Sequence, residues 1–241
     1  MLMHSNSNLI TFGEAAAIDL PEATRSYQPV SNEYLINTVV DSIEGQGLVL
    51  KDLELSASTD GQRLFGCAKI KHDNDEIAPA ICFRNSYDKS MSVGLASGAK
   101  VFVCDNLQIQ GSSFTKLRKH TTNVMEDVGS LVSDAVEAIV PDFEKELRTI
   151  EDMEFRYISL EQGYQFLGLL RGLGILNSKC FNIALKEWKT PQHDCFPSNN
   201  LWSLYNACTE GLKGLNASYA LQEMVKFDRA FKKDVLRLRA A

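Results

Sequence analysis

The chain has 241 residues, of which 44% are hydrophobic and 23% are charged, and its formal net charge is −6. These values are typical of a globular protein with one large domain or two small ones, and they exclude an intrinsically disordered chain. The negative charge argues against phosphate binding by the whole surface, and without a run of roughly 18–20 apolar residues or a secretory signal the sequence predicts a cytoplasmic protein with no membrane contact.

The N-terminal part begins with a segment that follows no regular pattern. We expect residues 1–28 to form a flexible arm, because their apolar side chains follow neither a helical nor a strand period. Ser31 is a suitable N-cap for a helix over about 32–45, since its hydroxyl can accept a backbone N–H of the first turn. Gly45 and Gly47 then end this helix.

A meander of antiparallel strands follows. Residues 53–57 alternate between apolar and polar side chains, which predicts a half-buried strand, and Asp60 with Gly61 predicts a tight hairpin turn after it. Further strand-forming runs lie over residues 64–70, 77–83, 91–96 and 100–104. Pro79 favours an edge position or a bulge for its strand, and a Ser-Gly step at 97–98 separates the last two strands. We therefore expect about five antiparallel strands.

Downstream of the sheet the hydrophobic period changes from two to about 3.6. Apolar side chains recur every three or four positions from Val124 to Ile139, which predicts an amphipathic helix that Pro141 interrupts or bends. Four more helices are expected over residues 160–173, 180–188, 201–212 and 219–238. The fold class is therefore α+β: a helix and an antiparallel sheet over residues 29–120, then a helical half over 121–241 that packs on the sheet as one domain.

A polar cluster at the end of the third strand is the first candidate site. Arg84, Asn85, Ser86, Tyr87 and Asp88 stand where one strand ends and the next begins. Asn, Ser and Asp bond nearby backbone in turns, so a structural turn accounts for most of the cluster. A cation, an aromatic ring and a carboxylate together exceed what a turn needs, so ligand binding by Arg84, Tyr87 or Asp88 stays open. No histidine base or nucleophile elbow lies nearby, which disfavours catalysis.

Metal and cofactor sites are not expected. Cys180, His193, Cys195 and Cys208 offer zinc-ligand atoms, but their spacing matches no compact zinc motif. The acidic loop at residues 73–76 lacks the glycine and the distal glutamate of a calcium loop. No Walker motif or dinucleotide fingerprint occurs either. We therefore expect no metal and no cofactor, and a protein that acts by binding rather than by catalysis.

Two segments resemble a family that is associated with phages and plasmids and is catalogued as a domain of unknown function. In the first, which runs from FRNSYDKS to KVFVCDNL, the similarity is to an Asn-Ser-Tyr-Asp-Gly-Ser-like turn and a Val-Cys-x-Asn-Gly-like strand end, on Asn85, Ser86, Tyr87, Asp88, Cys104 and Asn106. In the second, NNLWSLYNACTEGL, it is to a Trp-x-x-x-Asn-Ala-x-Thr-Glu segment, on Trp202, Asn206 and Glu210. The resemblance covers about residues 30–215 and implies a mobile-element origin without implying an activity.

The sequence departs from the family pattern at two positions. Lys89 and Leu107 stand where the family usually has glycine, so we expect both turns to differ here. The order of elements, in which a helix precedes a hairpin, more strands and a long helix, also resembles the core of single-strand annealing proteins. That topological resemblance raises the expectation of nucleic-acid binding.

A nucleic-acid surface combines basic side chains with aromatic rings. The candidates are, near the last strand, Lys116, Arg118 and Lys119 beside Phe114, and, in the C-terminal tail, Lys232 and Lys233. Residues 213–241 hold 7 basic and 3 acidic side chains. Such a tail also suits a helix C-terminus or a self-associating helix, so both phosphate contact and homo-oligomerisation stay open.

The leading hypothesis is a DNA-associated accessory protein of a mobile element that binds or anneals single strands. In this hypothesis the turn at residues 84–88 and the segment at 116–120 face the nucleic acid, with Tyr87 or Phe114 available to stack on a base. The helical half would mediate assembly into a homo-oligomer.

Two alternatives stay open. Residues 121–161 hold 11 acidic and 3 basic side chains, so the acidic helix over 123–146 suits a counter-defence protein that imitates nucleic acid and binds a host protein. The third hypothesis is an enzyme built on the cluster of Tyr87, Asp88, Asp105 and Asn106.

Overall fold

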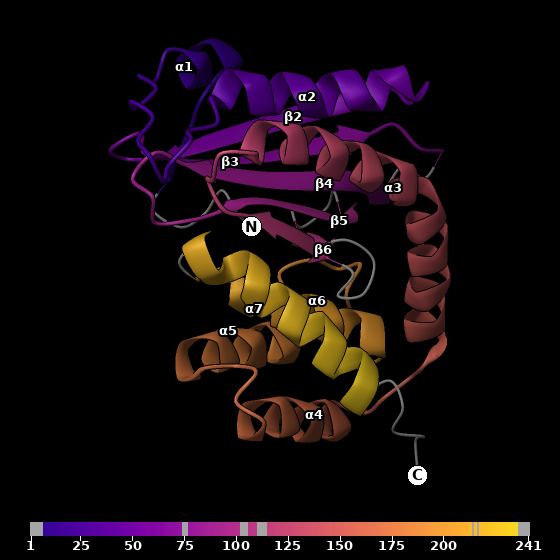
Figure 1. Ribbon diagram of the computed structural model, residues 1–241. Helices are drawn as coiled ribbons and strands as arrows, with labels where there is room; N and C mark the ends of the chain where they lie inside the picture. Colours follow the sequence, from indigo (N-terminus) through magenta and orange to yellow (C-terminus); the bar gives the residue numbers. More distant parts are fainter. Residues whose placement is uncertain are drawn as a thin grey trace.

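An antiparallel sheet with helices on both faces organises the molecule (Figure 1). The computed structural model describes residues 7–73, 77–101, 106–109, 115–213, 215 and 217–235. Within these residues the sheet has seven strands. In chain order they are β1 (Ser7–Leu9), β2 (Leu50–Ser58), β3 (Arg63–Ile70), β4 (Ile77–Ser86), β5 (Val93–Val101), β6 (Asn106–Ile109) and β7 (Thr115–Arg118). The α+β fold class is therefore confirmed.

The strands lie in chain order from β1 to β6, and the outer side of β5 carries two of them. β6 pairs with residues 98–101 of β5, and β7 pairs with residues 93–96. The hairpin between β2 and β3 turns at Gly61, whose φ of +72° is the left-handed conformation that favours glycine. This arrangement places β7 beside the start of β5 and β6 beside its end.

One face of the sheet packs on α1 (Phe12–Ala16), α2 (Asn32–Gly45) and the first half of α3 (Val124–Phe155). The predicted cap of α2 is confirmed, because the Ser31 hydroxyl accepts the Tyr34 N–H at 3.0 Å. The core on this side joins side chains of β3, β4 and β5 to one stripe of each helix, including Leu35, Val39, Leu64, Ile81, Phe83, Leu95, Val128 and Val132.

The other face packs on the helical half of the chain. Its helices are α4 (Leu160–Gly172), α5 (Ser178–Lys189), α6 (Leu201–Leu212) and α7 (Ala217–Ala230), and the last continues into a π-helical turn, η1 (Phe231–Val235). Figure 1 shows α5, α6 and α7 below the sheet and α4 beyond them. An aromatic cluster from α6, α7 and η1 fills this core, with Tyr205 5.0 Å from Phe227 and 5.1 Å from Phe231 between ring centres.

Helix α3 bends and connects the two cores. Figure 1 shows its first half crossing one face of the sheet and its second half running down the side of the molecule. Pro141 lies inside this 32-residue helix, lacks a backbone N–H and crowds the preceding turn, so it accounts for the change of direction. Val128 and Ile139 before the bend belong to one core, and Phe143 and Ile150 after it belong to the other. The predicted bend is confirmed.

Two sequence predictions about the strands were wrong, and the N-terminal arm holds two short elements that the sequence did not predict. The sequence predicted two strands, at 91–96 and 100–104, joined by a turn at Ser97 and Gly98. Instead, β5 continues through both residues and pairs with β4 along its length. Pro79 lies in an interior strand, where its missing N–H is tolerated because it stands one residue beyond the last pair with β3. The N-terminal arm contains β1 and α1, two elements too short to leave a periodic signal.

No helix in the part of the chain that the structure describes is long and apolar enough to cross a membrane.

Candidate functional site

The turn after β4 and the segment after β7 lie at the same end of the sheet. Gly94 of β5 pairs with Arg84 on one side and with Leu117 on the other. Segments that are about thirty residues apart in the sequence therefore become neighbours. The sheet register thus brings together residues 84–88 and 116–120, the two segments proposed from the sequence to face a common ligand.

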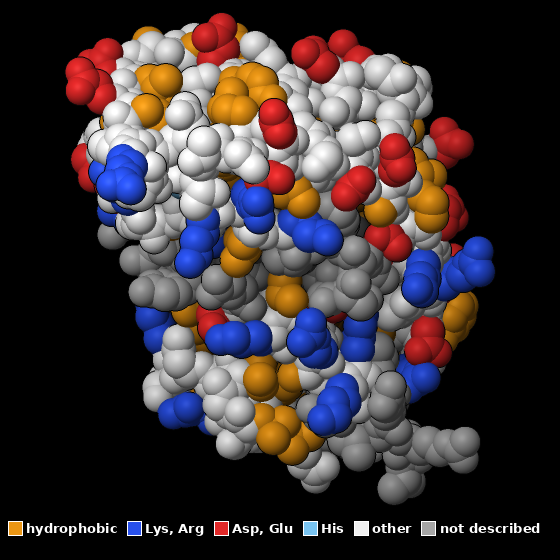
Figure 2. Space-filling view, viewed as in Figure 1, with side chains coloured by type: hydrophobic (Ala, Val, Ile, Leu, Met, Phe, Trp, Pro, Cys, Tyr) orange, Lys and Arg blue, Asp and Glu red, His pale blue; other side chains and the backbone are white. Residues whose placement is uncertain are grey.

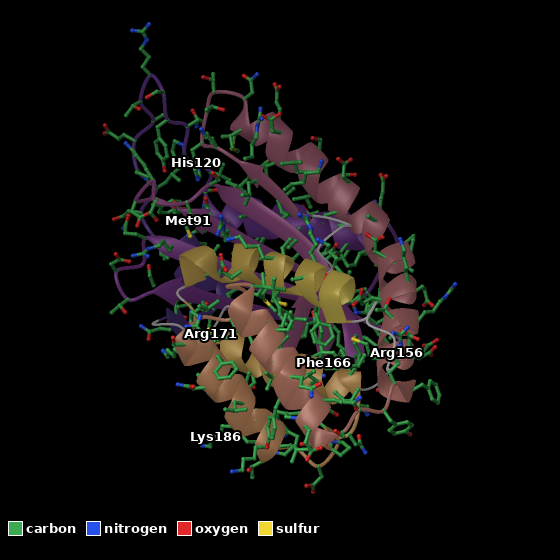
Figure 3. All side chains as sticks on the ribbon, turned by 90° about the horizontal axis from the view of Figure 1, so that it is seen from below. Met91, His120, Arg156, Phe166, Arg171 and Lys186 are labelled. Carbon is green, nitrogen blue, oxygen red and sulfur yellow. The ribbon has the colours of Figure 1, made fainter. Side chains whose placement is uncertain are left out.

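A cavity of about 300 Å³ lies between these segments and the N-terminal arm. We call it the turn pocket, and it is lined by residues 26–27, 89–92 and 119–121. Tyr27, Met91 and His120 are buried and form its floor, whereas Lys89 and Lys119 are exposed at its rim. Figure 3 labels Met91 and His120, which lie close together at this end of the sheet.

Lys89 holds an unusual backbone conformation in the pocket. Its φ of +64° is the left-handed region that favours glycine, and among the described non-glycine residues no other has a positive φ. Glycine adopts this conformation without steric cost, so the backbone here favours the residue that the family resemblance implies at this position. The Lys89 ammonium lies 4.6 Å from the centre of the Tyr27 ring, which is a cation–π distance.

The His120 ring is bonded to the N-terminal arm and has one buried nitrogen without a partner among the described residues. Its Nδ1 lies 3.3 Å from the Gln28 carbonyl oxygen, which can only accept, so Nδ1 carries the proton in the neutral ring. Its Nε2 is buried and has no hydrogen-bond partner among the described residues. Burial lowers the pKa of His120, although the bond to Gln28 acts in the opposite direction. The ring therefore favours the neutral form, with Nε2 as an acceptor.

The family-like turn holds the end of β4 to the start of α2. Tyr87 accepts the Asn32 N–H at 2.8 Å through its phenol oxygen, and Asn85 donates to the Val30 carbonyl at 2.7 Å. Ser86 closes the turn, since its hydroxyl donates to the Met91 carbonyl at 2.9 Å. Both Asn85 and Tyr87 are buried, so the Tyr87 ring is not exposed for stacking on a base.

Arg84 and Asp88, at the two ends of the turn, are also used within the protein. Arg84 is 4% exposed and burial lowers the pKa of its guanidinium. Its side chain lies on the same face of the sheet as Cys82, away from α2. Asp88 accepts the Ser90 N–H at 2.9 Å and lies 3.2 Å from Nε of Arg63. The direct ligand contacts predicted for Arg84 and Tyr87 therefore have no exposed side chain to make them.

The hypothetical catalytic cluster is not assembled. Asn106 pairs with Val101, which pairs with Ile77 at the start of β4, whereas Asp88 follows the other end of that strand. The seven residue-to-residue steps from position 94 to 101 alone span roughly 23 Å at about 3.3 Å per step. Asp105 and Cys104 lie outside the described residues. The strand register therefore keeps Asn106 far from Tyr87 and Asp88.

Exposed basic side chains gather on one face of the molecule. Figure 2 shows Lys and Arg in a band across the middle of this face, below the acidic side chains around α2 and α3. We give the name basic face to the exposed bases of β7, of the residue that follows β7, of α7 and of η1. They are Lys116, Arg118, Lys119, Lys226, Arg229 and Lys233. α7 packs against β6, which continues the line of β7 along β5, so both groups border the same edge of the sheet. Lys116 and Arg118 lie on the α3 side of that edge, and the α7 bases lie on the other side.

The members of the basic face differ in how far they are neutralised. Arg118 Nε donates to Asp127 at 2.6 Å, and Lys226 Nζ lies 2.5 Å from a Glu223 oxygen. Lys119 has no carboxylate partner among the described residues. Phe114, the proposed stacking residue beside them, lies outside the described part of the chain.

Lys232 lies in a network of buried charges instead of on the basic face. Its Nζ is 2.9 Å from Glu146 of α3 and 3.0 Å from Asp228 of α7, and Tyr205 donates to Asp228 at 3.1 Å. Burial by itself would lower the pKa of Lys232, but the two carboxylates outweigh it and raise that pKa. Lys232 therefore joins α3 to the C-terminal segment, and only Lys233 of the two predicted bases is exposed.

The second family-like segment is part of the core of α6. Trp202 stacks on Tyr205 at 5.7 Å between ring centres, and Asn206 Nδ2 donates to the Trp202 carbonyl at 2.9 Å. Glu210 is partly exposed and lies 2.5 Å from Nζ of Lys213. Asn206 and Glu210 line a cavity of about 10 Å³, which is the space of a single water molecule.

The described residues contain no group of three or more His, Cys, Asp or Glu side chains that could hold a metal ion. Cys180 and Cys208 are buried in the helical core and Cys195 is exposed, so the considered zinc ligands do not meet at one point. Burial raises the pKa of the Cys208 thiol well above its ordinary value. The buried thiol is therefore a neutral core side chain.

Sequence reasoning missed the contribution of the N-terminal arm and of Lys89 to the pocket. Tyr27 donates to the Ser86 carbonyl at 3.4 Å, and the Gln28 N–H donates to the His120 carbonyl at 3.0 Å. These contacts are tertiary and leave no local pattern. The signal that was present is Lys89, a bulky cation at a turn position where glycine is usual.

Comparisons with known proteins give one finding. No curated protein and no solved structure matched the chain significantly. A family model described as "Domain of unknown function (DUF932)" matches residues 20–230, which include the turn pocket, the sheet from β2 onward and both family-like segments. The chain therefore belongs to this family, a domain of unknown function.

Proposed function

We propose that the protein is an accessory protein of a mobile element that binds DNA, chiefly single strands, through its basic face. The observation that carries the proposal is the gathering of exposed bases from β7, α7 and η1 on one side, although the net charge of the chain is −6. Phosphate neutralisation by such a face supplies affinity that does not depend on base sequence. Acidic side chains elsewhere then restrict binding to that face.

The test is fluorescence anisotropy with labelled single-stranded and duplex DNA at several salt concentrations. We expect Lys116→Ala/Arg118→Ala/Lys119→Ala to weaken binding and to reduce the slope of log affinity against log salt by about 2, since each phosphate contact on a single strand contributes about 0.7. A matched control removes three exposed bases from α5, as Lys179→Ala/Lys186→Ala/Lys189→Ala. Figure 3 shows Lys186 far from His120.

The control separates a local surface from a general charge effect. Both triple variants change the net charge by the same amount, so equal losses of affinity would mean that no particular face is used. No DNA binding by the wild-type protein even at low salt would overturn the proposal.

A second candidate function has an observation of its own. The outer side of the α2–α3 layer is acidic, with Glu33, Asp41, Glu44, Glu126, Asp134 and Glu137 all exposed. Such a surface suits a counter-defence protein that occupies the nucleic-acid site of a host protein. This function predicts that the protein binds a basic host protein and does not bind DNA. Replacing the three α3 acids by their amides, as Glu126→Gln/Asp134→Asn/Glu137→Gln, should abolish binding to the host protein. Self-association stays a prediction, and light scattering tests it alongside either function.

A further inference from the structure

We propose that the turn pocket binds a phosphate monoester, either the terminal phosphate of a DNA strand or that of a free nucleotide. The inference rests on the proposed function, because it names the group that the nucleic-acid surface recognises at one end. It concerns a site separate from the exposed strip of β7 and α7, although Lys119 borders both.

The size of the pocket suits one nucleotide. Its volume of about 300 Å³ lies at the small end of the range for ligand sites. The floor is apolar and aromatic, from Tyr27 and Met91, while the rim carries hydroxyl groups from Ser26, Ser90 and Thr121. A single phosphate with part of its sugar therefore fits the combination of an apolar floor and a polar rim.

The charge of the pocket suits a phosphate that ends a chain. Lys89 and Lys119 bring two ammonium groups to the rim, and neither has a carboxylate partner among the described residues. A terminal phosphate carries about −1.5 to −2 charges near neutral pH, whereas a phosphate within a strand carries one. Two lysines thus match the terminal group better than the internal one.

His120 closes the floor of the pocket without offering it a hydrogen bond. The residue is 7% exposed, and its Nε2, which has no hydrogen-bond partner among the described residues, is itself buried from solvent. The pocket therefore offers two cations for the anionic oxygens and hydroxyl groups at its rim.

The backbone of Lys89 gives an independent argument. A lysine held at φ of +64° is less stable there than glycine, and residues in such strained conformations cluster at functional sites. The same property makes Lys89→Gly an informative variant. It removes the ammonium group while relieving the backbone, so a loss of binding in a folded variant comes from the missing cation.

The experiment compares labelled single-stranded oligonucleotides that differ only in a 5′- or 3′-terminal phosphate or hydroxyl, by fluorescence anisotropy. We expect the full-length protein to bind a phosphorylated end about tenfold more tightly, the effect of one charged hydrogen-bonding contact. Lys89→Gly and Lys119→Gln should each bring the ratio of the affinities for phosphorylated and hydroxyl ends closer to one. Lys186→Ala on α5 should retain it, and circular dichroism checks that each variant is folded.

A mononucleotide added alone, followed by calorimetry, identifies the source of the phosphate. If the wild-type protein binds the nucleotide but no DNA, and Lys89→Gly abolishes nucleotide binding, the pocket proposal is supported and the DNA proposal is overturned. If the protein binds oligonucleotides with phosphorylated and hydroxyl ends equally tightly and does not bind the nucleotide, the pocket proposal is overturned and the DNA proposal stays intact. No binding of any of these probes would overturn both.

Discussion

The polar side chains of the family-like turn form hydrogen bonds within the protein. Asn85 and Tyr87 are bonded to the chain that enters α2, and Asp88 and Ser86 bond backbone within the turn. These bonds fix where residues 89–92 stand, and those residues line the pocket. The motif therefore supports the pocket from behind, and the residues that line the pocket are its neighbours at 89–92.

His120 should make the stability of the protein depend on pH. Burial lowers its pKa below 6.5 in the folded state, so between that lowered value and 6.5 the unfolded chain binds more protons. The contribution of the neutral His120 ring to the free energy of unfolding is present above pH 6.5. It is lost as the pH falls through 6.5 towards the lowered pKa of the folded state. We expect the free energy of unfolding in urea to fall more for wild type than for His120→Gln between about pH 7.5 and 5.5.

The comparison needs a second histidine variant. His193 lies in the loop between α5 and α6, and His193→Gln serves as the matched control. Equal losses of stability in wild type and His120→Gln over the same pH interval would show that the His120 ring is not the group responsible.

At the scale of elements, glycines set how closely the helices of the lower layer approach. A Cβ on Gly163 of α4 would lie 2.1 Å from Nε1 of Trp188 on α5, and one on Gly211 of α6 would lie 2.4 Å from the carbonyl oxygen of Cys180. Both distances are far below contact, and the second involves backbone, which cannot rotate away. The three helices are therefore packed at nearly their smallest separation.

Gly211→Ala should destabilise the fold. The added methyl must push α5 and α6 apart, and overpacking of this kind costs about 1–3 kcal/mol or more. Gly168→Ala on α4 is the matched control, because a Cβ there meets nothing within 4 Å. We expect that control to be neutral or more stable by about 0.5–1 kcal/mol, from helix propensity alone. Urea unfolding measures both, and a stable Gly211→Ala protein would show that the helices can separate.

The sequence predicts those elements whose local pattern and packing agree. α2 and α6 have the predicted limits of 32–45 and 201–212, because cap residues and an apolar face define them. β5 was divided in two because Ser97 and Gly98 are typical of a turn, while pairing with its neighbours keeps them in a strand. The turn pocket depends on contacts between Tyr27, Ser86 and His120, which are distant in sequence, so no local pattern predicts it.

For the molecule as a whole, charge is divided between the layers. The outer side of α2 and α3 is acidic, whereas exposed bases gather along the sheet edge at β7 and on α7 and η1. The network of Glu146, Asp228 and Lys232 is where the two regions meet inside the protein. Lys232, which is next to the basic face in the sequence, thus joins α3 to the C-terminal segment.

Lys232→Met should separate these two roles. The change leaves two carboxylates, each with a side chain at most 3% exposed, without their shared ammonium, and breaking a buried pair costs about 3–5 kcal/mol. Lys233→Met removes the neighbouring exposed base and should leave the free energy of unfolding nearly unchanged while weakening DNA binding. Adding Glu146→Gln and Asp228→Asn to Lys232→Met should restore most of the lost stability, because no buried charge is then uncompensated. If Lys232→Met instead unfolds at the wild-type urea concentration and binds DNA less tightly, Lys232 belongs to the basic face and the network is incidental to the fold.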